Sequence, residues 1–251
     1  MAQRLDKELV SRGLAPTRSR AQQLIDSGAV LVNGSPEKAK ASLTVSESDE
    51  IRVNADIRSS GQYVSRGAIK LVEALEIFIP HGLPTPEGKN CLDVGASTGG
   101  FTQVLLQQGA QKVIALDVGH DQLDPLIEQD LRVIDASGVN IRDVNPADLE
   151  FAPDLVVSDV SFISLTYVIP VLAQIMPTDS HAVLLIKPQF EVGRSKLGKG
   201  GIVTQDAYRQ EAIDKVTQCA QDQGFTIREV TPSAITGTHG NQEYLLWITR
   251  A

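Results

Sequence analysis

The stretch CLDVGASTGGF, residues 91–101, decides the fold. Cys91 to Val94 form an apolar run interrupted only by Asp93, which is typical of a buried β-strand. The glycines that follow let the backbone turn tightly and approach a ligand closely. A helical pattern of apolar residues then begins at Phe101. The stretch therefore predicts a strand, a glycine-rich turn and a helix in direct succession.

Strands and helices alternate from here to the end of the chain. Strands that are almost purely apolar indicate a buried, mostly parallel sheet. The last two strands follow each other closely, which predicts a seven-stranded, doubly wound α/β sheet with an antiparallel edge. Ligands bind such sheets at the carboxyl ends of the strands. The predicted strands are Cys91–Val94, Val113–Asp117, Arg132–Asp135, Leu155–Ser158, Val183–Ile186, Phe225–Val230 and Tyr244–Ile248, and the predicted helices include Phe101–Gln108, Ser164–Ile175 and Ala207–Gln223.

The first sixty residues predict a separate, small α+β unit. Leu5, Leu9 and Val10 share one face of a helix that ends at Gly13. A second helix follows, with Thr17 as its N-cap. The strand Val30–Val32 leads into Asn33-Gly34, which is typical of a hairpin turn, and further short strands are predicted near Leu43–Val45 and Ile51–Val53.

A polar segment over 54–65 predicts a linker, so we expect two domains, 1–60 and 61–251. A helix from Arg66 to Ile79 should open the second domain. Its Ile69, Val72, Leu75 and Ile79 are expected to face the core.

Composition narrows the class of protein. The chain has 251 residues, of which 42% are hydrophobic and 22% charged, which is ordinary for a globular protein. No apolar run approaches the roughly 18 residues that span a bilayer, and the charged start MAQRLDKELV is unlike a secretory signal. Two cysteines, Cys91 and Cys219, exclude a disulfide framework and a zinc site built from cysteines, and they favour a reducing, cytoplasmic setting.

Charge is distributed unevenly along the chain. The net charge is −8, yet residues 1–70 carry +3 and the remainder −11. A basic head on an acidic body suggests that the two domains have different partners, although chance variation remains an alternative.

The glycine-rich turn and the residues after the next two strands predict a nucleotide-like pocket. The turn departs from the G-x-G-x-x-G pattern and is closer to the loop of S-adenosylmethionine (SAM) methyltransferases, where a carboxylate such as Asp93 suits a cationic ligand. Asp117 ends the second strand and is placed to accept the ribose hydroxyls of either NAD or SAM. Asn140 either bonds an adenine edge or simply caps a loop.

Four charged residues occur where strands of the predicted sheet begin or end. Asp159 and Lys187 follow apolar strands, Glu243 precedes the last strand, and Lys70 lies on the helix before the sheet. A lysine after a buried strand is costly unless it is paired, and Asp159 and Glu243 are the obvious partners. Desolvation disfavours the charged form of a lysine, so such a group is usable as a base. Each of the four, taken alone, is equally well a surface charge.

Other chemistry receives little support. The four histidines show no metal-binding spacing, so we expect no metal. A G-x-S-x-G nucleophile elbow is absent. The basic, glycine-rich segment 188–201 indicates either a lid or RNA-facing loop, or an ordinary solvated loop.

Longer motifs carry a resemblance to a known family. The head RLDKELVSRGLAPTRSRAQQLIDSGAVLVNG resembles an S4-type RNA-binding domain, and the remainder resembles an FtsJ/RrmJ-type methyltransferase. The motifs YVSRGAIKL, LDVGASTGGFT, ALDVGHDQL, SDVSFISL and IKPQFEVG, in this order, resemble the TlyA (hemolysin A) family over the whole chain.

The resemblance implies a Rossmann-like SAM methyltransferase sheet preceded by an S4-like domain, and SAM-dependent 2′-O-methylation of a ribose, with cytidine the family's target, in ribosomal RNA. The chain ends directly after the last strand, which favours large-subunit RNA. The family's catalytic Lys-Asp-Lys-Glu set matches Lys70, Asp159, Lys187 and Glu243. Lys187 would engage the 2′-hydroxyl, Asp159 would orient that lysine, and the other two would steer the ribose. The cofactor-binding residues implied are Asp93, Gly95, Ala96, Ser97, Gly99, Asp117 and Asn140.

Basic residues of both domains are the expected contacts to RNA phosphates, with a solvated basic face as the alternative. They are Arg4, Arg18, Arg20, Lys38, Lys40, Arg66, Arg194, Lys196 and Lys199. Three rival functions remain: an NAD(P) dehydrogenase, a non-catalytic RNA-binding or assembly factor, and a membrane-lysing protein. The sequence does not support a membrane-lysing protein, because it has no membrane-spanning segment and its net charge of −8 disfavours binding to anionic lipid. The sequence leaves the oligomeric state open.

Overall fold

The computed structural model describes residues 3–15, 18–26, 30–34, 40–46, 48–53, 63–237 and 240–250, and within 18–26 it leaves four side chains undescribed. The chain divides into two compact units, Met1–Arg66 and Gly67–Ala251. No helix within these described ranges is both long and apolar enough to cross a membrane.

The smaller unit packs two helices against short antiparallel strand pairs. α1 and α2 bury apolar residues such as Leu5, Leu9 and Leu24, whereas Val10 is 36% exposed, contrary to its prediction as a core residue. Its elements are β1 (Gln3–Arg4), α1 (Leu5–Ser11), α2 (Arg18–Asp26), β2 (Val30–Val32), β3 (Thr44–Val45) and β4 (Ile51–Val53), with β1 paired to β3 and β2 to β4.

The predicted Asn33-Gly34 turn forms at the end of β2, but β2 does not pair with the next described strand, β3. Both residues have positive φ, 52° and 79°, as a tight hairpin turn requires. The strand before them, β2, pairs with β4 rather than with β3, the next described strand, and the amide of Asn33 donates to the carbonyl of Glu50. The predicted N-cap Thr17 lies outside the described residues.

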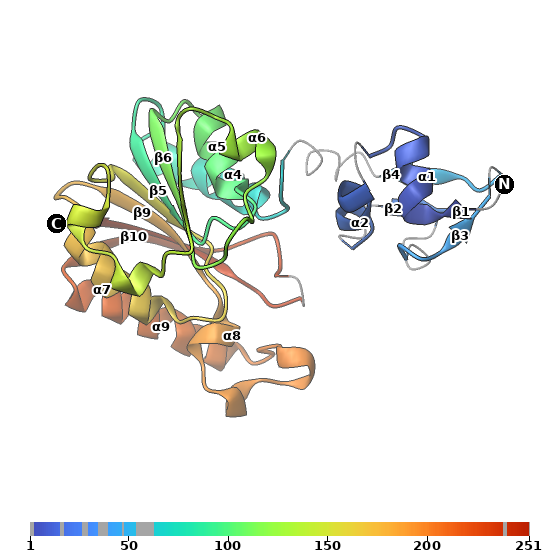
Figure 1. The fold of residues 1–251 in the computed structure, drawn as a ribbon. Helices are drawn as coiled ribbons and strands as arrows, with labels where there is room; N and C mark the ends of the chain where they lie inside the picture. Colours follow the sequence, from blue (N-terminus) through green and yellow to red (C-terminus); the bar gives the residue numbers. More distant parts are fainter. Residues whose placement is uncertain are drawn as a thin grey trace. The chain divides into compact units, whose positions relative to one another are not determined.

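The larger unit is built on the seven-stranded sheet predicted from the sequence (Figure 1). The strands lie in the order β10-β11-β9-β8-β5-β6-β7, and β11 is antiparallel to both of its neighbours. The antiparallel pair β10–β11 therefore forms one edge of the sheet, which confirms the predicted antiparallel edge. The strands are β5 (Asn90–Val94), β6 (Lys112–Asp117), β7 (Val133–Ser137), β8 (Leu155–Ser158), β9 (His181–Ile186), β10 (Phe225–Pro232) and β11 (Tyr244–Arg250).

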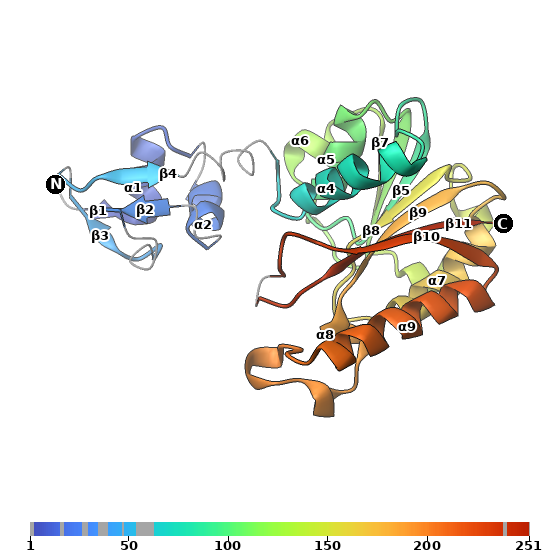
Figure 2. The ribbon, with the colours of Figure 1, turned by 180° about the vertical axis from the view of Figure 1, so that it is seen from behind.

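Helices cover both faces of this sheet. α4, α5 and α6 lie on one face and α7 and α9 on the other, as the two opposite views show (Figures 1 and 2). The α-helices are α4 (Ala68–Phe78), α5 (Gly100–Gln107), α6 (Pro125–Glu128), α7 (Leu165–Ile175), α8 (Pro188–Glu191) and α9 (Asp206–Asp222), and the short 3₁₀ turns are η2 (Ile79–His81), η3 (Ile141–Asp143), η4 (Pro146–Asp148), η5 (Arg194–Lys196) and η6 (Lys199–Gly201).

The buried face of α4 differs from the predicted one. Ile69, Val72 and Ile79 are only partly buried. The face that packs inward instead carries Ala68, Lys70, Leu71, Ala74, Leu75 and Phe78. A lysine thus lies in the buried stripe, and the apolar spacing alone could not reveal this.

Candidate active site

A cavity of about 530 Å³ opens at the carboxyl ends of the parallel strands. It lies where the strand order reverses at β5, which is the position at which sheets of this type bind ligands. Residues from the loops after β5, β6, β7 and β8 line it. They include Gly95, Ser97, Asp117, Val118, Gln122, Asn140, Arg142, Asp159, Val160, Ser161, Phe162 and Ile163.

The glycine-rich loop reaches its position through backbone that favours glycine. Gly95 has a φ of 86°, and a Cβ there would lie 3.0 Å from Cγ1 and 3.2 Å from Cα of Val160. The loops after β5 and β8 therefore approach each other too closely for a side chain. Asp117 holds the same loop from the other side, because its Oδ2 accepts from the amide of Ser97 at 2.8 Å and its Oδ1 from that of Gly119 at 2.8 Å.

Four of the seven predicted cofactor-binding residues line the cavity, namely Gly95, Ser97, Asp117 and Asn140. Asn140 also caps η3 by accepting from the amide of Arg142. Ala96 and Gly99 do not line it: Ala96 is buried, and Gly99 begins α5 against Ile127.

Asp93 is buried beneath the loop instead of facing a ligand. Its Oδ2 accepts from the amide of Thr102 at 2.9 Å and from the Thr102 hydroxyl at 2.7 Å. Burial raises the pKa of Asp93 to about 7, although the bonds from Thr102 oppose the shift. The predicted direct contact with a cationic ligand is therefore corrected: this carboxyl links β5 to α5.

The raised pKa of Asp93 predicts a pH dependence of stability. Between pH about 4 and about 7 the folded chain holds a proton that the unfolded chain releases, so this group's contribution to stability is lost as the pH rises through the folded pKa. An Asp93→Asn variant should lose less stability between pH 5 and pH 8 than the parent protein. Urea unfolding followed by the fluorescence of Trp247, the single tryptophan, measures both losses. Equal losses would contradict the shift.

Beside the cavity, the four predicted catalytic residues come together. The ammonium of Lys70 lies 2.5 Å from Oε2 of Glu243 and 3.8 Å from Oδ2 of Asp159. The ammonium of Lys187 lies 2.6 Å from Oδ1 of Asp159. These four side chains therefore form an ion chain of alternating charge, Glu243–Lys70–Asp159–Lys187. Asp159 belongs both to this ion chain and to the wall of the cavity.

The topology explains how residues so distant in sequence meet. Asp159 and Lys187 directly follow β8 and β9, which are parallel neighbours. Because β11 is reversed, its first residue Tyr244 pairs with Ile186 at the end of β9, and this brings Glu243 to the same edge. Lys70, Lys187 and Glu243 are buried, so each ammonium is held by carboxylates in a largely desolvated setting.

Two further residues belong to this site and were missed in the sequence. The hydroxyl of Ser161 accepts from the ammonium of Lys187 at 2.8 Å. Phe162 lines the cavity yet is 92% exposed, with a φ of 64° that is rare for a bulky residue, and its ring lies 5.1 Å from that of Phe190. Serine and phenylalanine are common after strands, so neither residue stands out in SDVSFISL. The available signal was their position just after the end of a predicted strand.

The predicted RNA contacts differ in their surroundings. Arg4 and Arg18 are exposed, and both bind the buried carboxylate of Asp6, which holds its pKa down at about 2. Lys40, Arg194 and Lys199 are exposed and Arg66 is partly buried. Lys196 is tied to α9 by an ion pair with Glu211 at 2.5 Å. Lys38 and the side chain of Arg20 lie outside the described residues.

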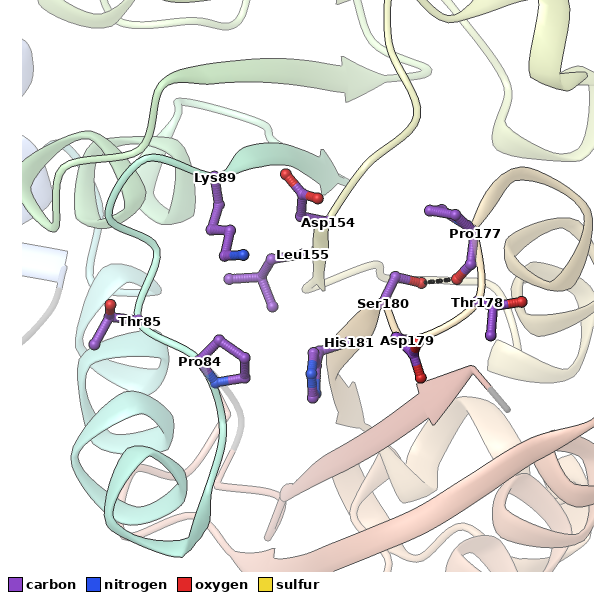
Figure 3. Close-up of a pocket in the computed structure, with 10 residues that line it drawn as sticks. All are labelled: Pro84, Thr85, Lys89, Asp154, Leu155, Pro177, Thr178, Asp179, Ser180 and His181. Carbon is purple, nitrogen blue, oxygen red and sulfur yellow. Dashed lines mark hydrogen bonds between the residues drawn. The ribbon is translucent and has the colours of Figure 1, made fainter.

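A second cavity, of about 250 Å³, lies at the opposite, amino-terminal edge of the sheet (Figure 3). Lys89, Asp154, Leu155, Asp179 and His181 are among the residues that line it, and no residue predicted for catalysis or cofactor binding does. Within the ranges that the structure describes, no group of three or more His, Cys, Asp or Glu side chains is arranged to hold a metal ion.

Family models match both parts of the chain. Residues 63–250 match the FtsJ-like methyltransferase family, and residues 3–51 match the S4 domain. The fold is shared with a Listeria monocytogenes protein named "putative S-adenosylmethionine dependent methyltransferase", at a TM-score of 0.55 and 16% identity over 74% of this chain and 100% of that one.

Relatives with the same two parts are more similar. "16S/23S rRNA (cytidine-2′-O)-methyltransferase TlyA" of Mycobacterium tuberculosis is 43% identical over 98% of this chain and 89% of its own length. "23S rRNA (cytidine-2′-O)-methyltransferase TlyA" of Campylobacter jejuni is 34% identical over 95% and 96%. The solved structure named "Putative hemolysin" from Streptococcus thermophilus is 37% identical, covers 100% of this chain and 89% of that chain, and has a TM-score of 0.77. The chain therefore belongs to the FtsJ-like methyltransferase family and, with its S4 domain, to the TlyA proteins within it.

Proposed function

We propose that this protein is a SAM-dependent methyltransferase that methylates the 2′-hydroxyl of a cytidine ribose in ribosomal RNA. The observation that carries the proposal is the ion chain beside the cavity, in which one carboxylate, that of Asp159, holds two buried ammonium groups. Curated relatives named as rRNA cytidine-2′-O-methyltransferases support the substrate. We propose large-subunit RNA, the target that the Campylobacter relative's name gives.

The cavity fits SAM in size and chemistry. Its volume lies within the roughly 300–1,000 Å³ of small-molecule sites, and apolar walls surround a few polar groups. Asp117 is the residue that would hold the ribose hydroxyls, and Asn140 the adenine edge, with Gly95 and Ser97 along the rest of the ligand. When bound, SAM supplies an electrophilic methyl group. We propose that no metal takes part.

Lys187 is the residue that would engage the reacting hydroxyl. Its ammonium group lies at the edge of the cavity, held by Asp159 and Ser161. A hydroxyl is a weak nucleophile. Once the Lys187 ammonium has given up a proton to solvent, its neutral amine would take up the proton of the hydroxyl as the oxygen attacks the methyl group. Asp159 orients this lysine, while Lys70 and Glu243 complete the charge balance and steer the ribose.

The domain at residues 1–60 would bind RNA and the domain at 61–251 would carry the reaction. Among the described residues, the two exposed guanidinium groups held by Asp6 keep N–H donors without a partner, which could bind phosphate. Binding of this kind weakens steeply with salt. Because its substrate is ribosomal RNA, we propose that the protein acts in the cytoplasm.

One experiment tests the function. The protein is incubated with SAM carrying a tritiated methyl group and with ribosomal RNA, both free and in subunits, from cells that lack the protein. Label that resists alkaline cleavage at a single cytidine supports the proposal, and its subunit decides the target. Absence of label, together with stabilisation by NAD but not by SAM in a thermal-shift assay, favours a dehydrogenase. RNA binding without label or stabilisation favours an assembly factor.

Phe162 gives a further prediction. Its exposed ring at the mouth of the cavity is placed to stack on a base beside the reacting ribose. Stacking is worth about 1–3 kcal/mol per base, so Phe162→Ala should lower kcat/KM for RNA by a factor between about five and about 150. Phe162→Tyr should retain most activity, because a tyrosine ring also stacks.

A matched control is Leu131→Ala, which removes a fully exposed apolar side chain away from the cavity. This control should leave kcat/KM unchanged. If both alanine variants behave alike, the stacking role of Phe162 is wrong.

A further inference from the structure

Glu243 lies at the end of the loop between β10 and β11, and the first residues of this loop are bound by α4. The carboxylate of Glu73 on α4 accepts from the Ser233 hydroxyl at 2.7 Å and from the amide of Ala234 at 2.6 Å. Glu73 lies one helical turn after Lys70, which binds Glu243 at the other end of the loop. The loop is therefore fixed to the helix that supplies its catalytic partner.

Within this loop, Gly237 lies against the carboxylate of Glu243. A Cβ built on Gly237 would lie 2.4 Å from Oε1 and 3.2 Å from Cδ of Glu243. The nearest other atom is the carbonyl oxygen of Asn241, at 3.7 Å, which is an ordinary contact distance. Among the neighbours that the structure describes, a methyl group at position 237 would therefore collide with the carboxylate of Glu243.

The backbone gives no other reason for a glycine here. The φ of Gly237 is outside the left-handed region, so an alanine adopts the same conformation without strain. The amide of Gly237 donates to the carbonyl of Asn241 at 2.9 Å, and an alanine keeps this bond. The absence of a side chain therefore matters for the neighbouring carboxylate and not for the fold of the loop.

The carboxylate has little freedom to move aside and keep its partner. Glu243 is 2% exposed, and its Oε2 lies 2.5 Å from the ammonium of Lys70. Displacing Oε1 by a methyl group would rotate or withdraw the carboxylate and lengthen this contact. Lys70 would then rely on Asp159, whose Oδ2 is 3.8 Å away.

We infer that Gly237 is a positioning residue of the active site: the space left by its missing side chain holds the Glu243 carboxylate against Lys70. This inference rests on the proposed function, since it acts through Glu243. It adds a residue outside the cavity that sets the geometry of the ion chain. The SAM site is formed by other loops and does not depend on it.

Gly237→Ala tests the inference. Because a displacement of about 1 Å can cost up to a hundredfold in rate, we expect kcat to fall by about tenfold to a hundredfold. The dissociation constant for SAM should remain that of the parent, and the loss of thermal stability should be smaller than that of Asp159→Ala, because the Glu243 carboxylate is displaced but not removed. A variant that keeps full kcat, or that loses SAM affinity along with kcat, overturns the inference.

A double-mutant cycle separates a steric effect on Glu243 from a general effect on the loop. In Glu243→Asp the carboxylate is one methylene shorter and withdraws from position 237, so adding Gly237→Ala should cost less than twofold further. The same factor of loss in both backgrounds would overturn the inference.

A crystal structure of Gly237→Ala gives a readout that is independent of activity. The inference requires the distance from the Lys70 ammonium to Glu243 Oε2 to exceed a hydrogen-bond length, with the loop backbone unchanged. An unaltered contact overturns it. If the parent protein transfers no methyl group at all, the proposed function fails, and this structure still decides the steric inference.

Discussion

Lys187→Ala is expected to reduce methyl transfer by about a hundredfold to ten-thousandfold, the range that removal of a general base produces. Lys187 directly follows β9, and its ammonium lies against Asp159 and Ser161 at the cavity. The loss should appear in kcat, while affinity for SAM and for RNA stays close to that of the parent. Single-turnover transfer of labelled methyl groups, measured beside equilibrium binding of each ligand, checks all three quantities.

Two variants sharpen this test. Lys187→Arg keeps the positive charge but cannot release its proton, so it should be nearly as inactive as the alanine variant. Lys89→Ala removes a lysine at the opposite edge of the same sheet and should leave transfer unchanged (Figure 3). Full turnover by Lys187→Ala would remove this residue from the mechanism.

Asp159→Ala should abolish transfer and also destabilise the larger unit. The substitution leaves the Lys187 ammonium buried without its carboxylate, and removing one partner of a buried pair costs about 3–5 kcal/mol. Lys70 keeps Glu243 as a partner, so the loss falls mainly on Lys187.

The double variant Asp159→Ala with Lys187→Ala distinguishes an unpaired charge from simple loss of packing. With the ammonium also removed, the double variant should be more stable than Asp159→Ala alone, although both are inactive. Urea unfolding followed by Trp247 fluorescence measures each free energy of unfolding. If the loss of stability in the double variant equals the sum of the losses in Asp159→Ala and in Lys187→Ala, the two charges are not coupled.

The parts of the site that lie at strand ends could be predicted from the sequence. Asp117, Asp159 and Lys187 each directly follow an apolar run, and in a parallel sheet such ends meet at one edge. Glu243 precedes its strand, so its arrival at the same edge depends on the reversal of β11. The sequence predicted an antiparallel edge from the last two strands but did not show which of the two is reversed.

Side-chain direction could not be predicted in the same way. Asp93 belongs to the motif that decides the fold, yet its carboxyl turns toward Thr102 beneath the loop. Lys70 was assigned to the site, but the face of α4 predicted to pack inward did not include it, because apolar spacing counts only apolar residues. Such residues are buried only because a partner distant in sequence pairs with them.

The sequence also could not predict contacts that depend on how distant segments pack together rather than on residue type. The exposed ring of Phe162 looks like any apolar residue after a strand. In the smaller unit, Asp6 is an ordinary helix-surface residue in the sequence, but two arginines bury its carboxylate.

The central claim is that the reacting atom is a ribose oxygen held beside the ion chain. The most direct test replaces the target cytidine, once mapped, by 2′-deoxycytidine within an otherwise identical RNA substrate. The deoxy substrate is expected to bind and to compete with the normal RNA but to receive no methyl group. Methylation of the deoxy substrate would place the methyl group on the base and contradict the account.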